Sequence, residues 1–246
     1  MKTYCISDIH GHWTNFEKFI NTLDEDDKVY VLGDVIDKGT EAIKCLTYIM
    51  EDRRFKMLLG NHEYMMYQYL SSDPDSYEFF ESYERWVEWN SGGDTLNQYK
   101  LLPEHQRKQI FDFIIDLPLN YPDVKVNGRT FYLVHSCPGL DFQVRMKNFD
   151  FNDNKICAYV WNRVHPLDKL DLKDRIVVAG HTVVQHYLGL FADEMRPVYD
   201  NNDKLCSDDE NIVNAHYIDI DGGLAGSFSN SRLISLCLDD LSFKMY

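Results

Sequence analysis

The sequence lacks paired cysteines and long apolar runs, and each absence removes a class of protein. Its six cysteines are irregularly spaced with no C-x-x-C pair, so we expect reduced, mostly buried thiols and no disulfide framework or zinc site. The 17 residues 176–192 carry no charge, but Gly180, His181 and Gln185 favour strand, loop, strand over a membrane span. Asp8 interrupts the N-terminal apolar run before a signal-peptide core forms, so we expect a cytoplasmic protein.

Basic residues are also scarce. Lysine and arginine total 25 against 40 aspartates and glutamates, which gives a net charge of −15 over 246 residues. This balance argues against a nucleic-acid duplex or an anionic membrane as the main partner. A small phosphorylated substrate remains open, because bound cations can reverse the local charge. The composition, 44% hydrophobic and 26% charged, is that of a globular protein of one or two domains.

Strand and helix patterns alternate through the first sixty residues. The predicted elements are strands at 2–7, 29–32 and 55–59 and helices at 13–23 and 42–50. Thr14 and Glu17 can form a capping box at the start of the first helix. This order predicts parallel strands joined by right-handed crossovers.

The rest of the chain predicts a helical insertion and a second sheet. Residues 64–116 are helical in pattern, acidic and rich in aromatic residues, and we expect them to cap one face of the core. Asn127-Gly128 between two apolar runs predicts a hairpin with a type I′ turn. Further strands are expected at 176–179, 217–220, 233–238 and 242–245, and a mobile polar loop at 200–211.

Polar residues gather where the predicted strands end. They are Asp8, His10, Asp34, Asp37, Asn61, His62, His135, His181 and Asp221. Ligand sites of α/β sheets lie at the carboxyl ends of strands, and converging aspartates and histidines need a cation. A mixed oxygen and nitrogen set without thiolate suits Mn, Fe, Zn or Co better than Ca, with enough ligands for two metals that share one carboxylate. Two ions about 3.5–4 Å apart, with a hydroxide between them, are suited to displacement at phosphorus.

Five short motifs carry a more specific signal. They are S-D-I-H-G at 7–11, G-D-V-I-D-K-G at 33–39, G-N-H-E at 60–63, L-V-H-S at 133–136 and G-H-T at 180–182. Each alone is weak; G-N-H-E, for example, could simply begin a helix with Asn61 as its N-cap. In this order they resemble the calcineurin-like metallophosphoesterases, closest to the phosphoprotein phosphatase branch. V-W-N-R at 160–163 and W-N-S-G-G at 89–93 resemble its bacterial and bacteriophage members and the related symmetrical diadenosine tetraphosphatases.

The resemblance implies a fold and a set of residue roles. The implied fold is α/β, a four-layer sandwich of two mixed sheets flanked by helices, as one domain over 1–246 with a helical cap at about 64–116. The implied metal ligands are Asp8 and His10 for one ion, Asp34 for both, and Asn61, His135 and His181 for the other. His62 would protonate the leaving oxygen and Asp37 would orient His62. Arg163, Lys38 and Asn61 would bind the phosphate, Lys38 standing where arginine is commonest.

The leading functional hypothesis is therefore a metal-dependent phosphatase for phosphate monoesters. The resemblance implies phosphoserine or phosphothreonine in proteins as substrate, attacked by a metal-bridging hydroxide, and two divalent ions, with manganese expected and iron, zinc or cobalt as alternatives. A symmetrical dinucleoside tetraphosphate hydrolase is the first alternative. A non-catalytic metal-binding scaffold is the second, disfavoured because no ligand is missing. Neither a nucleic-acid duplex nor a membrane is expected as partner, and no feature indicates the oligomeric state.

Overall fold

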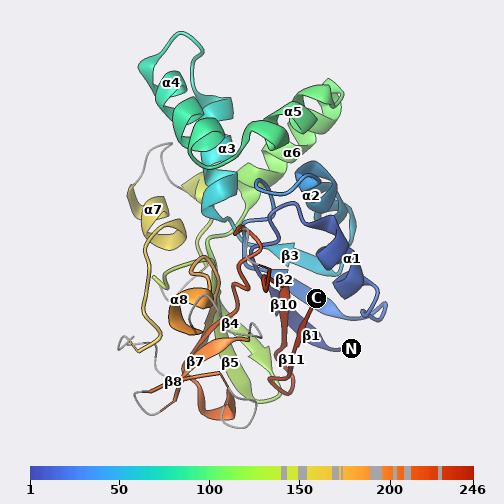
Figure 1. Ribbon diagram of the computed structural model, residues 1–246, viewed down its shortest axis with the longest axis vertical. Coiled ribbons are helices and arrows are strands. Elements are labelled where there is room, and N and C mark those ends of the chain that lie inside the picture. Colours follow the sequence, from blue (N-terminus) through green and yellow to red (C-terminus); the bar gives the residue numbers. More distant parts are fainter. Residues whose placement is uncertain are drawn as a thin grey trace.

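Two β-sheets with helices around them form the described part of the protein (Figure 1). The computed structural model describes residues 1–139, 143–148, 154–167, 172, 174–188, 196–201, 204–207, 212–226 and 229–246. The strands are β1 (Thr3–Ile6), β2 (Lys28–Val31), β3 (Phe55–Met57), β4 (Asn120–Val126), β5 (Arg129–Val134), β6 (Ile176–Ala179), β7 (Val198–Asn201), β8 (Lys204–Cys206), β9 (Tyr217–Asp219), β10 (Ile234–Cys237) and β11 (Phe243–Met245). The α-helices are α1 (Trp13–Ile20), α2 (Ala42–Glu51), α3 (Asn61–Ser71), α4 (Tyr77–Tyr83), α5 (Gly93–Leu101), α6 (Glu104–Asp116), α7 (Asn154–Val160) and α8 (Gln185–Leu188).

Both sheets are mixed. The first has the order β11-β10-β1-β2-β3, in which β1, β2 and β3 are parallel and β10 runs antiparallel to β1. The second has the order β4-β5-β6-β9-β7-β8, with β5, β6 and β9 parallel. The parallel strands at the centre of each sheet therefore deliver their carboxyl ends to the same edge, as the strand and helix alternation predicts.

Side chains that alternate along the central strands explain the layers. In β2, Val29 and Val31 pack into a core with α1 and α2, whereas Tyr30 packs into a second core. That second core also holds Phe131 and Leu133 of β5, so it lies between the two sheets. Because the central strands are buried on both faces, they are nearly continuous apolar runs in the sequence. The fold is the predicted α/β sandwich of two mixed sheets flanked by helices.

The helical insertion lies at one end of the molecule, where Figure 1 shows α3, α4, α5 and α6 grouped beyond the sheets. A π-helical turn, Glu84–Glu88, continues α4 toward α5. Helix begins at Asn61, three residues before the predicted start at 64, because the extended backbone of Gly60 caps α3. Trp86 and Tyr64 are buried in the core that the insertion shares with α2.

The predicted hairpin is confirmed, and three local predictions are wrong. Asn127 and Gly128 have φ values of 47° and 79°, as a type I′ turn requires. Thr14 is not a cap, because backbone hydrogen bonds to the carbonyl of His12 already begin α1 at Trp13.

The other two wrong predictions concern short polar segments. Residues 185–188 form α8, not a strand, with the Gln185 side chain bonded to the Gly222 carbonyl. Strands β7 and β8 pair within the expected loop at 200–211, of which 202–203 and 208–211 lie outside the described residues. Among the described helices, none combines the length and the apolar character that crossing a bilayer requires.

Candidate functional site

The predicted site residues stand at strand ends in strained backbone. Asp8 and His10 follow β1, Asp34 and Asp37 follow β2, and His181 follows β6. All five have positive φ values, between 47° and 71°. Such values are costly for residues other than glycine, and they concentrate where surrounding structure holds a functional geometry. The strain indicates that these turns aim their side chains at one place.

Asp34 lies between two groups of histidines. Its Oδ2 is 3.6 Å from His10 Nε2, and its Oδ1 is 3.5 Å from His135 Nε2. Asp34 thus belongs to both groups that could hold a metal among the described residues, one with His10 and His62 and one with His135 and His181. Asp8 lies beside the first group, with its Oδ1 3.9 Å from His10 Nε2. The carboxylate that was expected to bridge occupies the central position.

The imidazole rings are oriented by backbone carbonyls. The Nδ1 of His10 is 3.0 Å from the Ile36 carbonyl, and the Nδ1 of His135 is 2.8 Å from the Leu32 carbonyl. Each Nδ1 therefore donates its proton to a carbonyl, which leaves Nε2 with a lone pair that faces Asp34. Burial lowers the pKa of both histidines well below its usual value, so both rings stay neutral and could accept a metal at Nε2.

The polar atoms of the second group fit a cation. Asn61 Oδ1 lies 3.0 Å from His135 Nε2, so two lone pairs face each other. The Nε2 of His181 is buried without a partner among the described atoms. Burial and the nearby Glu63 raise the pKa of Asp34 well above its usual value, so its charge is uncompensated as well. Imidazole, carboxylate and amide oxygen together suit a divalent transition metal, and these residues fit one.

His62 and Asp37 form a separate pair at the edge of the first group. His62 Nδ1 is 2.6 Å from Asp37 Oδ2, and its Nε2 is 3.9 Å from Asp34 Oδ2. Burial and then Lys38 lower the pKa of His62 to about 3, whereas burial raises the pKa of Asp37 to about 7. Burial thus disfavours either charge alone, and one short hydrogen bond joins the two groups. The Nε2 of His62 is close enough to His10 and Asp34 to contact a metal held there, whereas its Nδ1 is hydrogen-bonded to Asp37.

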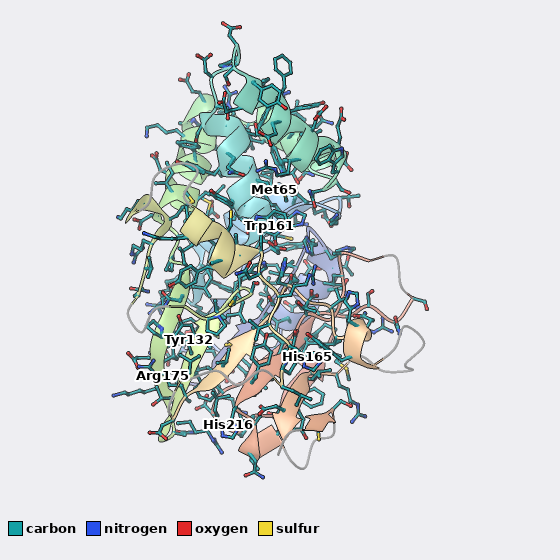
Figure 2. All side chains as sticks on the ribbon, turned by 90° about the vertical axis from the view of Figure 1, so that its left-hand side faces the viewer. Met65, Tyr132, Trp161, His165, Arg175 and His216 are labelled. Carbon is teal, nitrogen blue, oxygen red and sulfur yellow. The ribbon has the colours of Figure 1, made fainter. Side chains whose placement is uncertain are left out.

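The two predicted phosphate-binding cations differ in their surroundings. Arg163 is exposed, and its Nη1 donates to the His181 carbonyl at 3.3 Å and to Thr182 Oγ1 at 3.1 Å. Its charge contributes to the fall in the pKa of His181 to about 4, after burial as the main cause. Lys38 is half-buried beside His62. Figure 2 shows Trp161, two residues before Arg163, below Met65 of α3, where the insertion meets the sheets.

Comparison with known proteins decides the family. The sequence profile of the family described as "Calcineurin-like phosphoesterase" matches residues 1–185, three quarters of the chain. The chain belongs to the calcineurin-like phosphoesterase family. This agrees with the resemblance that the five motifs carry.

Relatives of this phosphoesterase have several names. A bis(5'-nucleosyl)-tetraphosphatase, symmetrical, from Delftia acidovorans is 28% identical over 140 residues, which cover 55% of this chain and 44% of that protein. The chain thus matches less than half the length of this curated relative. A metallophosphoesterase from Sphaerobacter thermophilus superposes with a TM-score of 0.59 at 14% identity, covering 100% of this chain and 88% of that one. A cold-active protein-tyrosine phosphatase from Shewanella has a TM-score of 0.55 at 12% identity, with 99% and 80% covered. At these identities the two structures show a shared fold.

Three residues of this phosphoesterase were not assigned roles from the sequence. Glu63, fully buried, accepts hydrogen bonds from the backbone N–H groups of Gly60, Asp34, Val35 and Ile36. Its position three residues into a helix is a capping signal that could have found it. Burial and then the charge of Asp221 raise the pKa of Asp8 well above its usual value, and burial raises the pKa of Asp221 to about 6. Trp86 contacts Asp37, and no local pattern predicts that contact.

Proposed function

We propose that this phosphoesterase hydrolyses phosphate monoesters at a dinuclear centre built around Asp34. The observation that carries the proposal is that the two oxygens of Asp34 face different histidines, at 3.6 and 3.5 Å. Asp8, His10 and Asp34 would hold one divalent ion, and Asp34, Asn61, His135 and His181 the other. When bound, two such ions supply Lewis acidity toward phosphoryl oxygens and activate water, and manganese is the ion we expect.

The protein's own side chains would donate the proton and bind the phosphate. In its protonated form His62 would donate from Nε2 to the leaving oxygen, while Asp37 accepts from Nδ1 and offsets the burial that lowers the pKa of His62. Arg163 and Lys38 bind phosphoryl oxygens, and the amide of Asn61 can donate to one of them. The exposed position of Arg163 lets it meet a substrate from solvent.

Two substrate classes are supported by different observations. The resemblance of W-N-S-G-G and V-W-N-R to bacterial and bacteriophage phosphatases supports phosphoserine or phosphothreonine in proteins, although the same motifs also resemble symmetrical diadenosine tetraphosphatases. The name of the Delftia relative favours a symmetrical dinucleoside tetraphosphate as the second candidate. The cytoplasmic location and the organisation of 1–246 as one domain with a cap stay predictions. None of the six cysteines forms a disulfide.

One parallel assay tests both classes. The protein is incubated with Mn²⁺ and either a phosphoserine peptide or diadenosine tetraphosphate, with the Asp34→Asn variant as control. Release of phosphate from the peptide supports the monoesterase, and release of ADP from the dinucleotide supports the alternative. Absence of turnover with both substrates and with an aryl phosphate would contradict a phosphoesterase activity.

A further inference from the structure

Trp86 connects the helical insertion to the His62–Asp37 pair. Its side chain is fully buried, and its indole Nε1–H donates to Asp37 Oδ2 at 2.8 Å. The same oxygen accepts from His62 Nδ1 at 2.6 Å. The other oxygen, Oδ1, is buried without a partner among the described residues. Both strong donors therefore converge on one oxygen, which fixes the rotation of the Asp37 carboxylate.

The backbone around Trp86 is shaped to hold the indole. Trp86 lies in the π-helical turn, which the Trp89 N–H closes by donating to the Glu84 carbonyl at 3.0 Å. Turns of this type are rare and are often found at functional sites. The side chain of Asn90 donates to the Arg85 carbonyl at 2.6 Å. The W-N-S-G-G motif thus finishes the turn that places Trp86.

Gly92 leaves the space that the indole needs. Its φ is −76°, so the backbone tolerates any residue. A Cβ at this position, however, would lie 2.5 Å from Trp86 Nε1, the atom that donates to Asp37. A Cβ at the adjacent Gly93 would meet only Val87 Cγ1, at 3.8 Å. The two glycines therefore form a matched pair that differs in contact with the indole.

We infer that Trp86 is a positioning residue, whose indole N–H holds Asp37 Oδ2 against His62 Nδ1. Thr95, at the start of α5, assists by accepting from the Asp37 backbone N–H at 3.1 Å. With Oδ2 fixed, the His62 ring keeps its Nε2 toward Asp34, 3.9 Å away, where a leaving oxygen would depart. The inference rests on the proposed role of His62 as the general acid, and it adds that the insertion completes the acid.

A spectroscopic test does not depend on activity. The short hydrogen bond between His62 and Asp37 should give a downfield proton resonance, identified by its loss in His62→Asn. Trp86→Phe removes the indole N–H but keeps an aromatic ring, and we expect the resonance to broaden or disappear. Trp13→Phe is the matched control, because Trp13 Nε1 also donates to a carboxylate, Glu17, at 3.0 Å but on the outer helix α1. A resonance unchanged in Trp86→Phe overturns the inference.

A kinetic test separates positioning from folding. Trp86→Phe should lower kcat about tenfold for an alkyl phosphate and clearly less for an aryl phosphate, whose leaving group needs little protonation, with KM unchanged. Both substrates are assayed on one sample, so a loss of folded enzyme cancels in the ratio. In the His62→Asn background the same substitution should change the alkyl rate less than about twofold, because the two residues act as one unit. Equal losses for both esters, or additive losses, overturn the inference.

The glycine pair gives a second route if Trp86→Phe does not fold. Gly92→Ala should displace the indole and reproduce both the spectral and the kinetic change, whereas Gly93→Ala should leave both as in the wild type. Identical behaviour of the two variants overturns the inference. Wild-type protein that turns over no phosphate ester contradicts the proposed function instead, and the proton resonance still decides whether Trp86 holds the pair.

Discussion

The two sheets contribute halves of the site that differ in how firmly the backbone holds them. The first-sheet half consists of Asp8, His10, Asp34, Asp37, Asn61 and His62, and the second-sheet half consists of His135, Arg163 and His181. In the first-sheet half every residue is at most 5% exposed, and Glu63 ties the backbone after β2 to the start of α3. In the second-sheet half only His135 is fully buried, and Arg163 is exposed.

This difference matches the work proposed for each half. Metal ligands and a general acid must already be in place when the substrate arrives, because reorganisation during the reaction raises the barrier. A phosphate-binding arginine must instead reach a substrate from solvent, and its long side chain can adapt. Substitutions in the first-sheet half should therefore cost more activity than those in the exposed part of the second-sheet half.

The largest effect is expected for Asp34→Asn. This change removes the charge shared by both ligand groups and leaves two dications to repel each other, so activity should fall by several orders of magnitude and metal content should drop. Activity assays together with elemental analysis of the purified variant measure both. Two retained metals with near-normal turnover would sink the central role of Asp34.

The second largest effect is expected for His62→Asn. Loss of the general acid should lower kcat about 10²–10⁴-fold for alkyl phosphates while metal content stays near normal. The loss should be smaller for aryl phosphates, so a leaving-group series measures the acid role directly. Loss of one metal in this variant would show that His62 is a ligand, as its distance to Asp34 permits.

A smaller effect is expected for Arg163→Ala in the second-sheet half. Its planar guanidinium can hold two phosphoryl oxygens through to the transition state. Its loss should therefore raise KM and lower kcat, so that kcat/KM falls about tenfold. Lys38→Ala should cost less, and Lys38→Arg should be tolerated. Steady-state kinetics at saturating Mn²⁺ compare the three variants. If Lys38→Ala proves far worse than Arg163→Ala, the main phosphate contact is Lys38, beside the first-sheet half.

The smallest effect concerns the pH dependence of stabilisation by Mn²⁺. Burial raises the pKa of Asp221 to about 6 and that of Asp34 well above its usual value, so without metal the stability that these carboxyls contribute is lost as pH rises through about 6 and beyond. A cation favours the ionised carboxylates, while the histidine ligands are already neutral. The rise in melting temperature that Mn²⁺ causes should therefore become larger between about pH 6 and 8. Each kcal/mol of added stability corresponds to a rise of about 2–4 °C.

Calorimetry with and without chelator checks this pH dependence, and Asp34→Asn serves as the control that should show little of it. A gain that shrinks as pH rises across this window would argue against carboxylate ligands with raised pKa values. The stability of the first-sheet half would then not depend on a bound cation.

Local patterns predicted most of the fold, and contacts distant in sequence account for what they missed. Strands β1, β2 and β3 follow from apolar runs that end in polar residues, and the hairpin follows from Asn127-Gly128. Helix α8 was missed because an uncharged stretch fits a strand or a buried helix equally well, and here the side chain of Gln185 is fixed by Gly222 from another segment.

The site shows the same contrast between local sequence patterns and contacts that are distant in sequence. Most of the predicted residues stand in motifs at strand ends, which converge in a parallel sheet, whereas the role of Arg163 was implied by the resemblance alone. The contact between Trp86 and Asp37 joins residues 49 positions apart through a π-helical turn, so neither periodicity nor spacing predicts it. The roles of the predicted residues remain to be tested by the variants above.

The most direct test of the central claim is anomalous diffraction from crystals of the wild-type protein grown with Mn²⁺. The geometry around Asp34 predicts two manganese peaks about 3.5–4 Å apart. One should lie on the His10 side of the carboxylate and the other on the His135 side. A single peak, or peaks that Asp34 does not contact, would contradict a dinuclear centre built on this residue.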